Sequence, residues 1–353
     1  MCQNNLKQSK KKQQQPGSHS RQPQHPGAKQ RKKQQSWESP REQPQPQLNA
    51  VALMAPRFDN PTNNCWFNSV LQVLVQAIRS EGDSINLFEA PIQEHLRAYG
   101  EAIYVELQKY QQPGQYSVNS ICTSSQRRLS LKQLMLFAMG IARKEELHSQ
   151  RDAADCFSTI LLITRKLSFL WHIQLENFEC ENCRVSVATS TPHPIAPVAI
   201  SNSIRRNSID AAGAIRNFFE STERGIERDC QNCHGKKSTK STTLPTPPKF
   251  IVVQLLRFQT RKLRNVTTVH KIDNEAEPFS SVEIHTGQGI CNYEVIASIQ
   301  HIGTRMDQGH YIAYIKRDNN WLCCNDQIIT PLGNTANEPT RHAYIVLLQH
   351  ADD

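Results

Sequence analysis

Long apolar runs are absent from this sequence, and none approaches the roughly 20 residues needed to span a bilayer. The N-terminus also lacks the charged-then-apolar pattern of a secretory signal peptide. Both absences favour a soluble intracellular protein, expected in the cytoplasm, the nucleus or both, and they exclude the membrane as an expected partner. The chain has 353 residues and 38% hydrophobic content, which is enough for a large buried core.

Excess positive charge is scarce outside one segment, although the formal net charge is +9. The first 50 residues hold ten basic and two acidic residues, which leaves 31 basic and 30 acidic residues for the rest of the chain. Phosphate binding needs clustered positive charge, so the near-neutral body does not predict a nucleic-acid surface. Nucleic acid stays a candidate partner only through the basic tail.

Residues 1–50 are rich in Gln, Lys, Pro and Ser and poor in aromatic and branched apolar residues. Such a segment cannot bury enough surface to offset chain entropy, so we expect a disordered tail, followed by one folded body over 51–350. The basic clusters Lys10–Lys12 and Arg31–Lys33 fit a solvated tail or a nuclear import signal.

Helical spacing of apolar residues dominates the first half of the body, and β-prone stretches dominate the second. The spacing predicts helices over 65–79, 91–110, 130–147 and 152–168. After Trp171 it predicts strands, with one helix around Ile209–Glu220 between them; the strands are Ile173–Phe178, Val185–Thr189, Phe250–Arg257, Tyr293–Gln300, Tyr311–Lys316 and Tyr344–Leu348. Helices first and strands second indicate an α+β fold.

Cysteine usage points to metal binding or thiol chemistry. The count is eleven, an odd number, which does not favour a disulfide framework. Four of them form two Cys-x-x-Cys pairs, Cys180 with Cys183 and Cys230 with Cys233. Two such pairs supply the four thiolates of a closed, structural zinc site, with each pair at the tip of its own β-hairpin. Four unrelated thiols and a redox pair are the alternatives, and His234 is a spare ligand or an exposed residue.

Cys65 is the candidate nucleophile because it begins the predicted helix 65–79. Asn63 and Asn64 are suitable N-cap residues for that helix. Unpaired backbone N–H groups and the helix dipole favour a thiolate there, and the same groups can bind the oxyanion of a tetrahedral intermediate. Asn60 lies just before them and can add a side-chain amide to the oxyanion hole.

His310 is the candidate base. It opens the strand that ends at Lys316, and a turn leads to a return strand beginning at Trp321. If Lys316 pairs with Trp321, His310 lies diagonal to Asn325, about 7–8 Å away at Cα, so that Asn325 can orient the imidazole ring. His301 is the rival base. Asp326 is the rival orienter. Only one of the two neighbours is expected to face the ring because adjacent strand residues point opposite ways, and the other can then hold a nearby loop or a water molecule.

Five motifs in order resemble the ubiquitin-specific proteases, which are papain-like cysteine deubiquitinases. The cysteine box reads Arg57-Phe-Asp-Asn60-Pro-Thr-Asn-Asn-Cys65-Trp-Phe-Asn68-Ser69-Val-Leu71-Gln72, and the histidine box runs from Tyr293 through Gly309-His310-Tyr311 to Asn325-Asp326. Gln150–Asp155, Leu244–Phe258 and the paired cysteines complete the series. The resemblance spans about residues 56–349. It implies a helical thumb, a β-rich palm and zinc-ribbon fingers over about 173–258.

The resemblance implies hydrolysis of the isopeptide bond after the ubiquitin C-terminus through a thioester on Cys65. By position it makes His310 the base, Asn325 the third member and Asn60 the oxyanion donor. It places Asp152 and Asp155 against the basic tail of ubiquitin, with the loop Ile302–Gln308 over that tail; a simple helix-surface charge is the alternative for the two acids. The expected cofactor is structural Zn²⁺, and the expected state is a monomer that binds ubiquitin and ubiquitinated proteins.

The chain also departs from the family pattern around the nucleophile. Thr62 stands where the family has glycine, at a position where the backbone can need a positive φ or a close approach. Asn64, Trp66 and Phe67 are further replacements, and Asp155 shortens an expected Glu. These changes keep open a catalytically weak or inactive ubiquitin-binding module of the same fold. A zinc-ribbon nucleic-acid binder that acts through the tail is a third hypothesis.

Overall fold

The computed structural model describes residues 55–82, 91–122, 128–141, 148–201, 208–263, 266–305, 308–334 and 337–351. The predictions for the basic tail over 1–50 and for order from Val51 to Met54 lie outside these residues. Within them, no helix is both long enough and apolar enough to cross a membrane.

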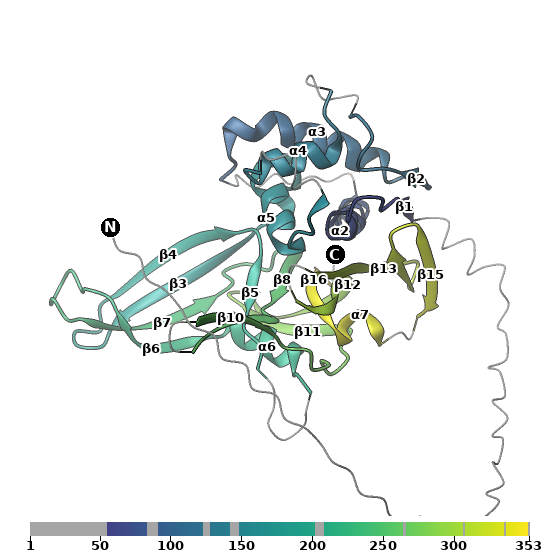
Figure 1. Ribbon diagram of the computed structural model, residues 1–353. Coiled ribbons are helices and arrows are strands. Elements are labelled where there is room, and N and C mark those ends of the chain that lie inside the picture. Colours follow the sequence, from purple (N-terminus) through teal and green to yellow (C-terminus); the bar gives the residue numbers. More distant parts are fainter. Residues whose placement is uncertain are drawn as a thin grey trace, which may run out of the picture. The chain divides into compact units, whose positions relative to one another are not determined.

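Helix α2 (Cys65–Glu81) forms the centre of the fold (Figure 1). It packs on strands of the large sheet on one side and on helices α3 and α5 on the other. Fifteen of its 17 residues are buried, so the helix has almost no solvent face. One of its buried amides finds a partner outside the helix, because Gln72 Nε2 donates to the carbonyl of Pro56 at 2.6 Å. The predicted helix over 65–79 is confirmed.

The other N-terminal helices cover α2. They are α3 (Arg97–Lys109), preceded by the 3₁₀ turn η1 (Glu94–Leu96), then α4 (Leu131–Ala138), α5 (Ala153–Ile163) and the 3₁₀ turn η3 (Arg165–Leu170). The prediction of a helix over 130–147 was wrong at its end, because α4 stops at Ala138. Gly140 has φ of +75°, and the N–H of Ile141 donates to Leu136 O, which closes the helix with a Schellman motif.

The second half of the chain builds one large, mostly antiparallel sheet in the order β15-β14-β13-β12-β16-β8-β5, with β11 also paired to β12. Among the described strand pairs of this sheet, β5–β8 alone is parallel. The strands are β5 (Ala196–Val198), β8 (Phe250–Leu255), β11 (Ser281–Thr286), β12 (Gly289–Arg305), β13 (Gln308–Arg317), β14 (Asn320–Asn325), β15 (Ile328–Gly333) and β16 (Ala343–His350). Helices α6 (Ala211–Phe219) and α7 (Glu338–Arg341) accompany it.

A separate four-stranded sheet in the order β4-β3-β7-β6 extends beyond the large one (Figure 1). Its strands are β3 (His172–Cys180), β4 (Ser186–His193), β6 (Thr222–Glu227) and β7 (Lys237–Thr243). Two small ribbons complete the fold, β1 (Pro56–Phe58) with β2 (Gly114–Tyr116), and β9 (Phe258–Leu263) with β10 (Val266–Lys271).

The predicted loop over Ile302–Gln308 is largely strand. Strand β12 continues to Arg305, Ile302 pairs with His310, and the register shifts before the pair Arg305–Gln308. The remaining two residues of the predicted loop, 306 and 307, lie outside the described part. Gly309 has φ of +151°, and a Cβ at this position would clash with the carbonyl of Ile302 and the ring of His301. This crowding explains why glycine precedes His310.

Candidate active site

The hairpin β13–β14 has the register that the sequence predicts, because Lys316 pairs with Trp321. Its two turn residues, Asp318 and Asn319, both have positive φ, at 45° and 62°. This is the backbone of a two-residue type I′ turn, which Asp and Asn adopt readily and which matches the twist of the strands. The turn therefore fixes which residues of the two strands face each other.

His310 and Asn325 meet as a consequence of that register. The distance from His310 Nε2 to Asn325 Oδ1 is 2.6 Å. An amide oxygen can only accept, so Nε2 carries the proton and Nδ1 is left to face the thiol. Hydrogen bonding to Cys65 is the largest cause that raises the pKa of His310 to about 9, with help from Asn325 and the charge of Asp326 and against its burial. The structure thus brings Cys65, His310 and Asn325 together.

Cys65 is the first residue of α2 and is only 3% exposed. The N–H groups of Cys65 and Trp66 begin the helix and have no intrahelical acceptor, so they are available to an anion. Asn64 occupies the N-cap position but its side chain makes no capping bond, and Asn63 instead donates to His148 O at 2.9 Å. The prediction that an asparagine occupies the N-cap is confirmed for Asn64, although no side chain caps the helix.

The oxyanion loop, which we define as Asn60–Asn64, is shaped by side chains from within itself. The carbonyl oxygen of the Asn60 side chain accepts the backbone N–H of Asn64. The residue with positive φ is Asn63, at 54°, and not Thr62, where the family pattern suggested a need for glycine. Asn tolerates this left-handed conformation well, so Thr62 brings no backbone strain of this kind.

Asp326 holds this loop and the nucleophile helix together. Its carboxylate accepts the side-chain amides of Asn60 and Asn68, both at 2.8 Å, and its Oδ2 lies 3.9 Å from His310 Nε2. Asn325 thus makes the hydrogen bond to the ring and Asp326 holds the nearby loop, which is the division of tasks expected from the sequence. Asp326 lies beyond the end of β14 with φ of 52°, so the strand alternation no longer applies to it.

Asn68 was missed as a site residue. It lies one turn after Cys65 on α2, and its amide joins Asp326 Oδ1 and Asp59 O. The sequence did hold a signal for Asn68. An asparagine at a buried position of an apolar helix needs hydrogen-bond partners, which an apolar residue there would not. Position 68 is only 2% exposed, so an amide there needs partners, and the partners come from 9 and 258 residues away.

The rival base His301 is placed differently. It is 2% exposed, and Gln150 Nε2 lies 3.4 Å from its Nε2. Burial, followed by the nearby positive charge of Lys271, lowers the pKa of His301 to about 4. Its ring packs edge-on against Phe258 and Tyr311. His301 is therefore a neutral core histidine at physiological pH.

Asp152 and Asp155 line one side of a surface groove of about 750 Å³, together with Gln150, Phe258, Thr304 and Arg305. Asp152 caps α5 by accepting the N–H of Ala154 at 2.7 Å, and both of its oxygens accept the Tyr344 hydroxyl. Burial raises the pKa of Asp152, in spite of these hydrogen bonds. Asp155 is exposed. Asp152 thus has a structural task, because it caps α5 and binds Tyr344. Asp155 instead faces solvent.

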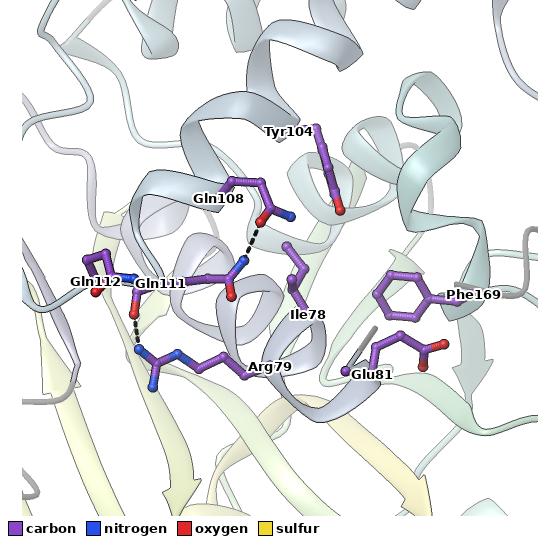
Figure 2. A pocket seen from close by; sticks show the side chains of 9 residues that line it. Ile78, Arg79, Glu81, Tyr104, Gln108, Gln111, Gln112 and Phe169 are labelled. Carbon is purple, nitrogen blue, oxygen red and sulfur yellow. Dashed lines mark hydrogen bonds between the residues drawn. The ribbon is translucent and has the colours of Figure 1, made fainter. Parts of the chain in front are cut away.

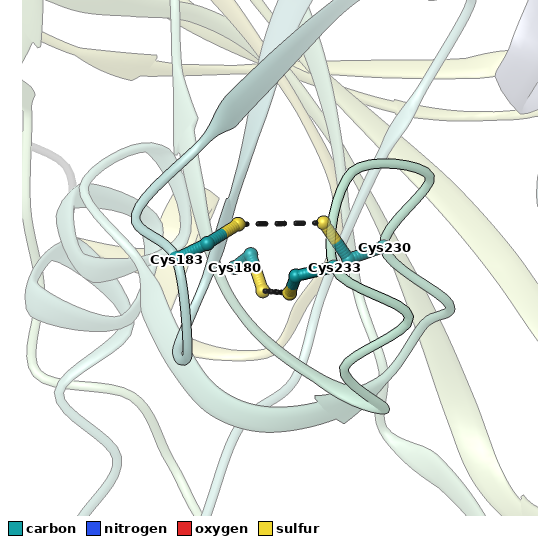
Figure 3. A group of neighbouring side chains, drawn as sticks. All are labelled: Cys180, Cys183, Cys230 and Cys233. Carbon is teal, nitrogen blue, oxygen red and sulfur yellow. Dashed lines mark hydrogen bonds between the residues drawn. The ribbon is translucent and has the colours of Figure 1, made fainter.

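The four paired cysteines converge between the tips of two hairpins (Figure 3). Cys180 and Cys183 lie at the β3–β4 turn, and Cys230 and Cys233 lie between β6 and β7. The two turns have the same backbone: the residue after each second cysteine, Arg184 or His234, has φ near 60° and donates its N–H to the carbonyl of the first cysteine. The prediction of two hairpin tips clipped together fits this geometry.

The sulfur positions suit a tetrahedral metal ion. The sulfurs lie within 4.8 Å of one another, and two pairs are 3.6 Å apart. A zinc ion with Zn–S bonds of about 2.3 Å requires sulfurs roughly 3.8 Å apart. Backbone N–H groups that point at Cys180 and Cys183 lower the pKa of both thiols, that of Cys183 to about 6. In spite of the Gly235 N–H, hydrogen bonds to these two sulfurs raise the pKa of Cys233 to about 12, so the protons that the cluster shares must leave when a metal binds. His234 is exposed and outside this set.

A second hollow lies at the far end of α2 (Figure 2). Ile78, Arg79, Tyr104 and Phe169 line it, and Arg79 donates to the carbonyl of Gln111. Fourteen residues of helix separate Arg79 from Cys65, which corresponds to about 20 Å along the axis. This hollow is therefore separate from the thiol site.

Comparison with known proteins agrees with this geometry. The family model for ubiquitin carboxyl-terminal hydrolase matches residues 57–347. Ubiquitin carboxyl-terminal hydrolase nonstop of Drosophila melanogaster is 31% identical over 107 residues, which is 29% of this chain and 21% of that protein. Ubiquitin carboxyl-terminal hydrolase 3 of Homo sapiens is 31% identical over 112 residues, 29% of this chain and 21% of that protein. The matched segments thus span only about a fifth of these relatives.

Among solved structures, the SAGA DUB module of Ubp8, Sgf11, Sus1 and Sgf73 bound to monoubiquitin superposes with a TM-score of 0.58 at 19% identity. The match covers 85% of this chain and 70% of that one, and it confirms the predicted α+β, papain-like fold class. Since the family model covers most of the folded body, the chain belongs to the ubiquitin carboxyl-terminal hydrolase family.

Proposed function

We propose that the protein is a thiol-dependent deubiquitinase that hydrolyses the isopeptide bond after the C-terminus of ubiquitin. The observation that carries this proposal is the meeting of Cys65, His310 and Asn325, which come from three elements separated by up to 260 residues. A nucleophile, a base and an orienter in that order form the arrangement required for acyl transfer through a thioester.

In the proposed mechanism, the thiolate of Cys65 attacks the carbonyl carbon of ubiquitin's last residue. The resulting oxyanion is bound by the N–H groups at the start of α2 and by the second amide hydrogen of Asn60, whose first one is held by Asp326. The imidazolium of His310 protonates the leaving lysine amine, and the thioester forms. His310 then removes a proton from water, which attacks the thioester and releases the ubiquitin carboxylate and Cys65.

The groove that holds Asp152 and Asp155 is the proposed path for the basic tail of ubiquitin. Asp155 is exposed and able to pair with an arginine, whereas Asp152 acts mainly by holding the start of α5 in place. We further propose that Cys180, Cys183, Cys230 and Cys233 bind a structural Zn²⁺. With four thiolate ligands the ion has no open position, so it stabilises the sheet and takes no part in the chemistry.

A ubiquitin derivative with an electrophile at its C-terminus tests the proposal directly. The wild-type protein should form a covalent adduct, and Cys65→Ala should form none while it still binds unmodified ubiquitin. Binding without an adduct by the wild type would instead identify a non-catalytic ubiquitin-binding module. Absence of both binding and adduct would reject ubiquitin as the substrate.

The pH dependence of the reaction should follow His310, whose pKa is raised to about 9. A raised pKa keeps the imidazolium available well above the usual value near 6.5. Hydrolysis of an isopeptide substrate, whose amine must be protonated as it leaves, should fall as the pH rises through about 9. Alkylation of Cys65 by iodoacetamide should persist there, because it needs the thiolate alone. Parallel loss of both rates above pH 9 would contradict this assignment.

Asp326→Asn should lower kcat/KM for ubiquitin hydrolysis by about 10- to 100-fold. The variant replaces an ionised acceptor of two amides with a neutral group, so Asn60 loses its charge-assisted bond and the imidazolium loses a nearby negative charge. Asp318→Asn, an equal charge change in the exposed β13–β14 turn, is the matched control and should keep full activity. Activity of Asp326→Asn within twofold of wild type would refute this role.

A further inference from the structure

Lys132 is a buried lysine near the start of α4, and only 2% of its surface is exposed. Burial of an ammonium is costly unless it is paired, and the N-terminal end of a helix is the unfavourable end for a cation. Both effects act against a lysine at this position. A lysine there therefore needs a compensating interaction, and its surroundings indicate what that interaction is.

The ammonium of Lys132 is directed at the oxyanion loop. Its Nζ donates to the carbonyl of Thr62 at 2.6 Å and to the Thr62 hydroxyl at 3.1 Å. The Thr62 hydroxyl in turn lies 3.0 Å from Asn64 Oδ1 and 3.3 Å from Asn119 Oδ1, both of which can accept it. Lys132 thereby holds the backbone three residues before Cys65. If position 62 were the glycine of the family pattern, Lys132 would keep the backbone carbonyl of that residue as a partner but would lose the hydroxyl.

The charges around Lys132 point to Cys65 as its counter-ion. Burial lowers the pKa of Lys132 to about 8, the negative charge of the Cys65 thiolate raises it, and the positive charge of Arg151 lowers it. His310, which faces the same thiol, is a further cation when protonated. Of the two charged groups that act on the pKa of Lys132, Cys65 is thus the one that favours the ammonium form when it is ionised. Because 8 lies above physiological pH, most Lys132 ammonium groups are charged there.

We propose that Lys132 is a positioning residue of the thiol site, which fixes the oxyanion loop through Thr62 and stabilises the Cys65 thiolate with its buried positive charge. The inference rests on the proposed function of Cys65 as the nucleophile. It assigns part of the thiolate's stabilisation to a residue of α4, outside the Cys65, His310 and Asn325 set. The geometry separates two contributions, a hydrogen bond to the loop and a charge, and they can be tested apart.

Alkylation of Cys65 by iodoacetamide, followed across pH, tests the charge without any need for ubiquitin. Lys132→Met removes the charge and the donor, and Lys132→Gln removes the charge but keeps a donor for Thr62. Both variants should shift the midpoint of the alkylation profile upward by about one pH unit, which corresponds to about tenfold slower alkylation at neutral pH. Only Lys132→Met should also lower kcat for ubiquitin hydrolysis beyond that shift. Lys166→Met, at an exposed lysine of η3, is the matched control.

A reciprocal measurement keeps the test valid if a Lys132 variant fails to fold. If the thiolate raises the pKa of Lys132, then removal of the thiol must lower it by the same amount that removal of Lys132 shifts Cys65. Titration of Lys132 by NMR, with ¹³C- and ¹⁵N-labelled lysine, should therefore give a lower pKa in Cys65→Ser than in the wild type. Equal values in both proteins, or alkylation profiles that coincide in all variants, would overturn the proposal. Coinciding profiles with an intact adduct to the ubiquitin probe would overturn the Lys132 proposal alone, whereas shifted profiles without an adduct would reject the deubiquitinase assignment alone.

Discussion

Cys65→Ala should reduce hydrolysis of ubiquitin conjugates by at least about 10⁴-fold, to the background rate. The thiol is the only group at the start of α2 that can form the acyl intermediate, and the neighbouring His310 and Asn325 cannot replace a nucleophile. Cleavage of a ubiquitin substrate with a fluorescent leaving group measures the loss. The removed atom is one buried sulfur, so the fold and the affinity for ubiquitin should persist.

Cys291→Ala is the control for this experiment. Cys291 is a half-buried free thiol on β12 whose sulfur lies 3.7 Å from Thr286 Oγ1, so its removal tests the general loss of a thiol. Its activity should match the wild type. Residual turnover by Cys65→Ala above a few per cent would show that another group performs the attack. Loss of activity in Cys291→Ala as well would point to a structural effect.

Loss of the proposed metal site should melt the four-stranded sheet. The outer strands β4 and β6 are exposed or half-exposed along their whole length, so they contribute almost no buried apolar surface. A sheet without a core depends on its cross-link, as in other small metal-stabilised units. Cys183→Ser or a strong chelator should therefore lower the Tm by about 10 °C or more, with loss of about one zinc ion per chain.

Metal analysis by mass spectrometry and thermal unfolding followed by circular dichroism measure these two effects. Cys323→Ser is the matched control, because Cys323 lies on β14 of the large sheet, away from the paired cysteines. It should keep both the metal and the Tm. A wild-type protein that folds fully without bound zinc, and that keeps its Tm in chelator, would contradict the proposed role of the four cysteines.

The local parts of the site could be predicted from the sequence. The apolar spacing after Cys65 defined α2, and the turn residues between Lys316 and Trp321 fixed the register that joins His310 to Asn325. Both follow from rules that act over a few residues, the periodicity of buried side chains and the positive φ of a tight turn. The Cys-x-x-Cys spacing of the paired cysteines likewise predicts a metal site from a few neighbouring residues.

Other long-range contacts of the site could not be predicted from local rules. Asp326 reaches Asn60 and Asn68 because the chain leaves β14 in a left-handed conformation. The alternation of side chains along a strand does not predict that conformation. Asp152 accepts a hydrogen bond from Tyr344, 192 residues away, and the residues around Asp152 give no sign of this contact. The extension of β12 to Arg305 likewise depends on pairing with β13 rather than on its own residues. These features arise from tertiary contacts that outweigh local propensity.

The position of β16 has a consequence for biosynthesis. This strand, Ala343–His350, pairs with β12 on one side and with β8 on the other, so the last strand in chain order fills an interior place of the large sheet. A nascent chain on the ribosome exposes unpaired edges of β8 and β12 until that strand has been made, and such edges attract other chains. Folding of this body must therefore wait until β16 has been made, and a premature stop before Ala343 should yield a product that requires chaperones or is degraded.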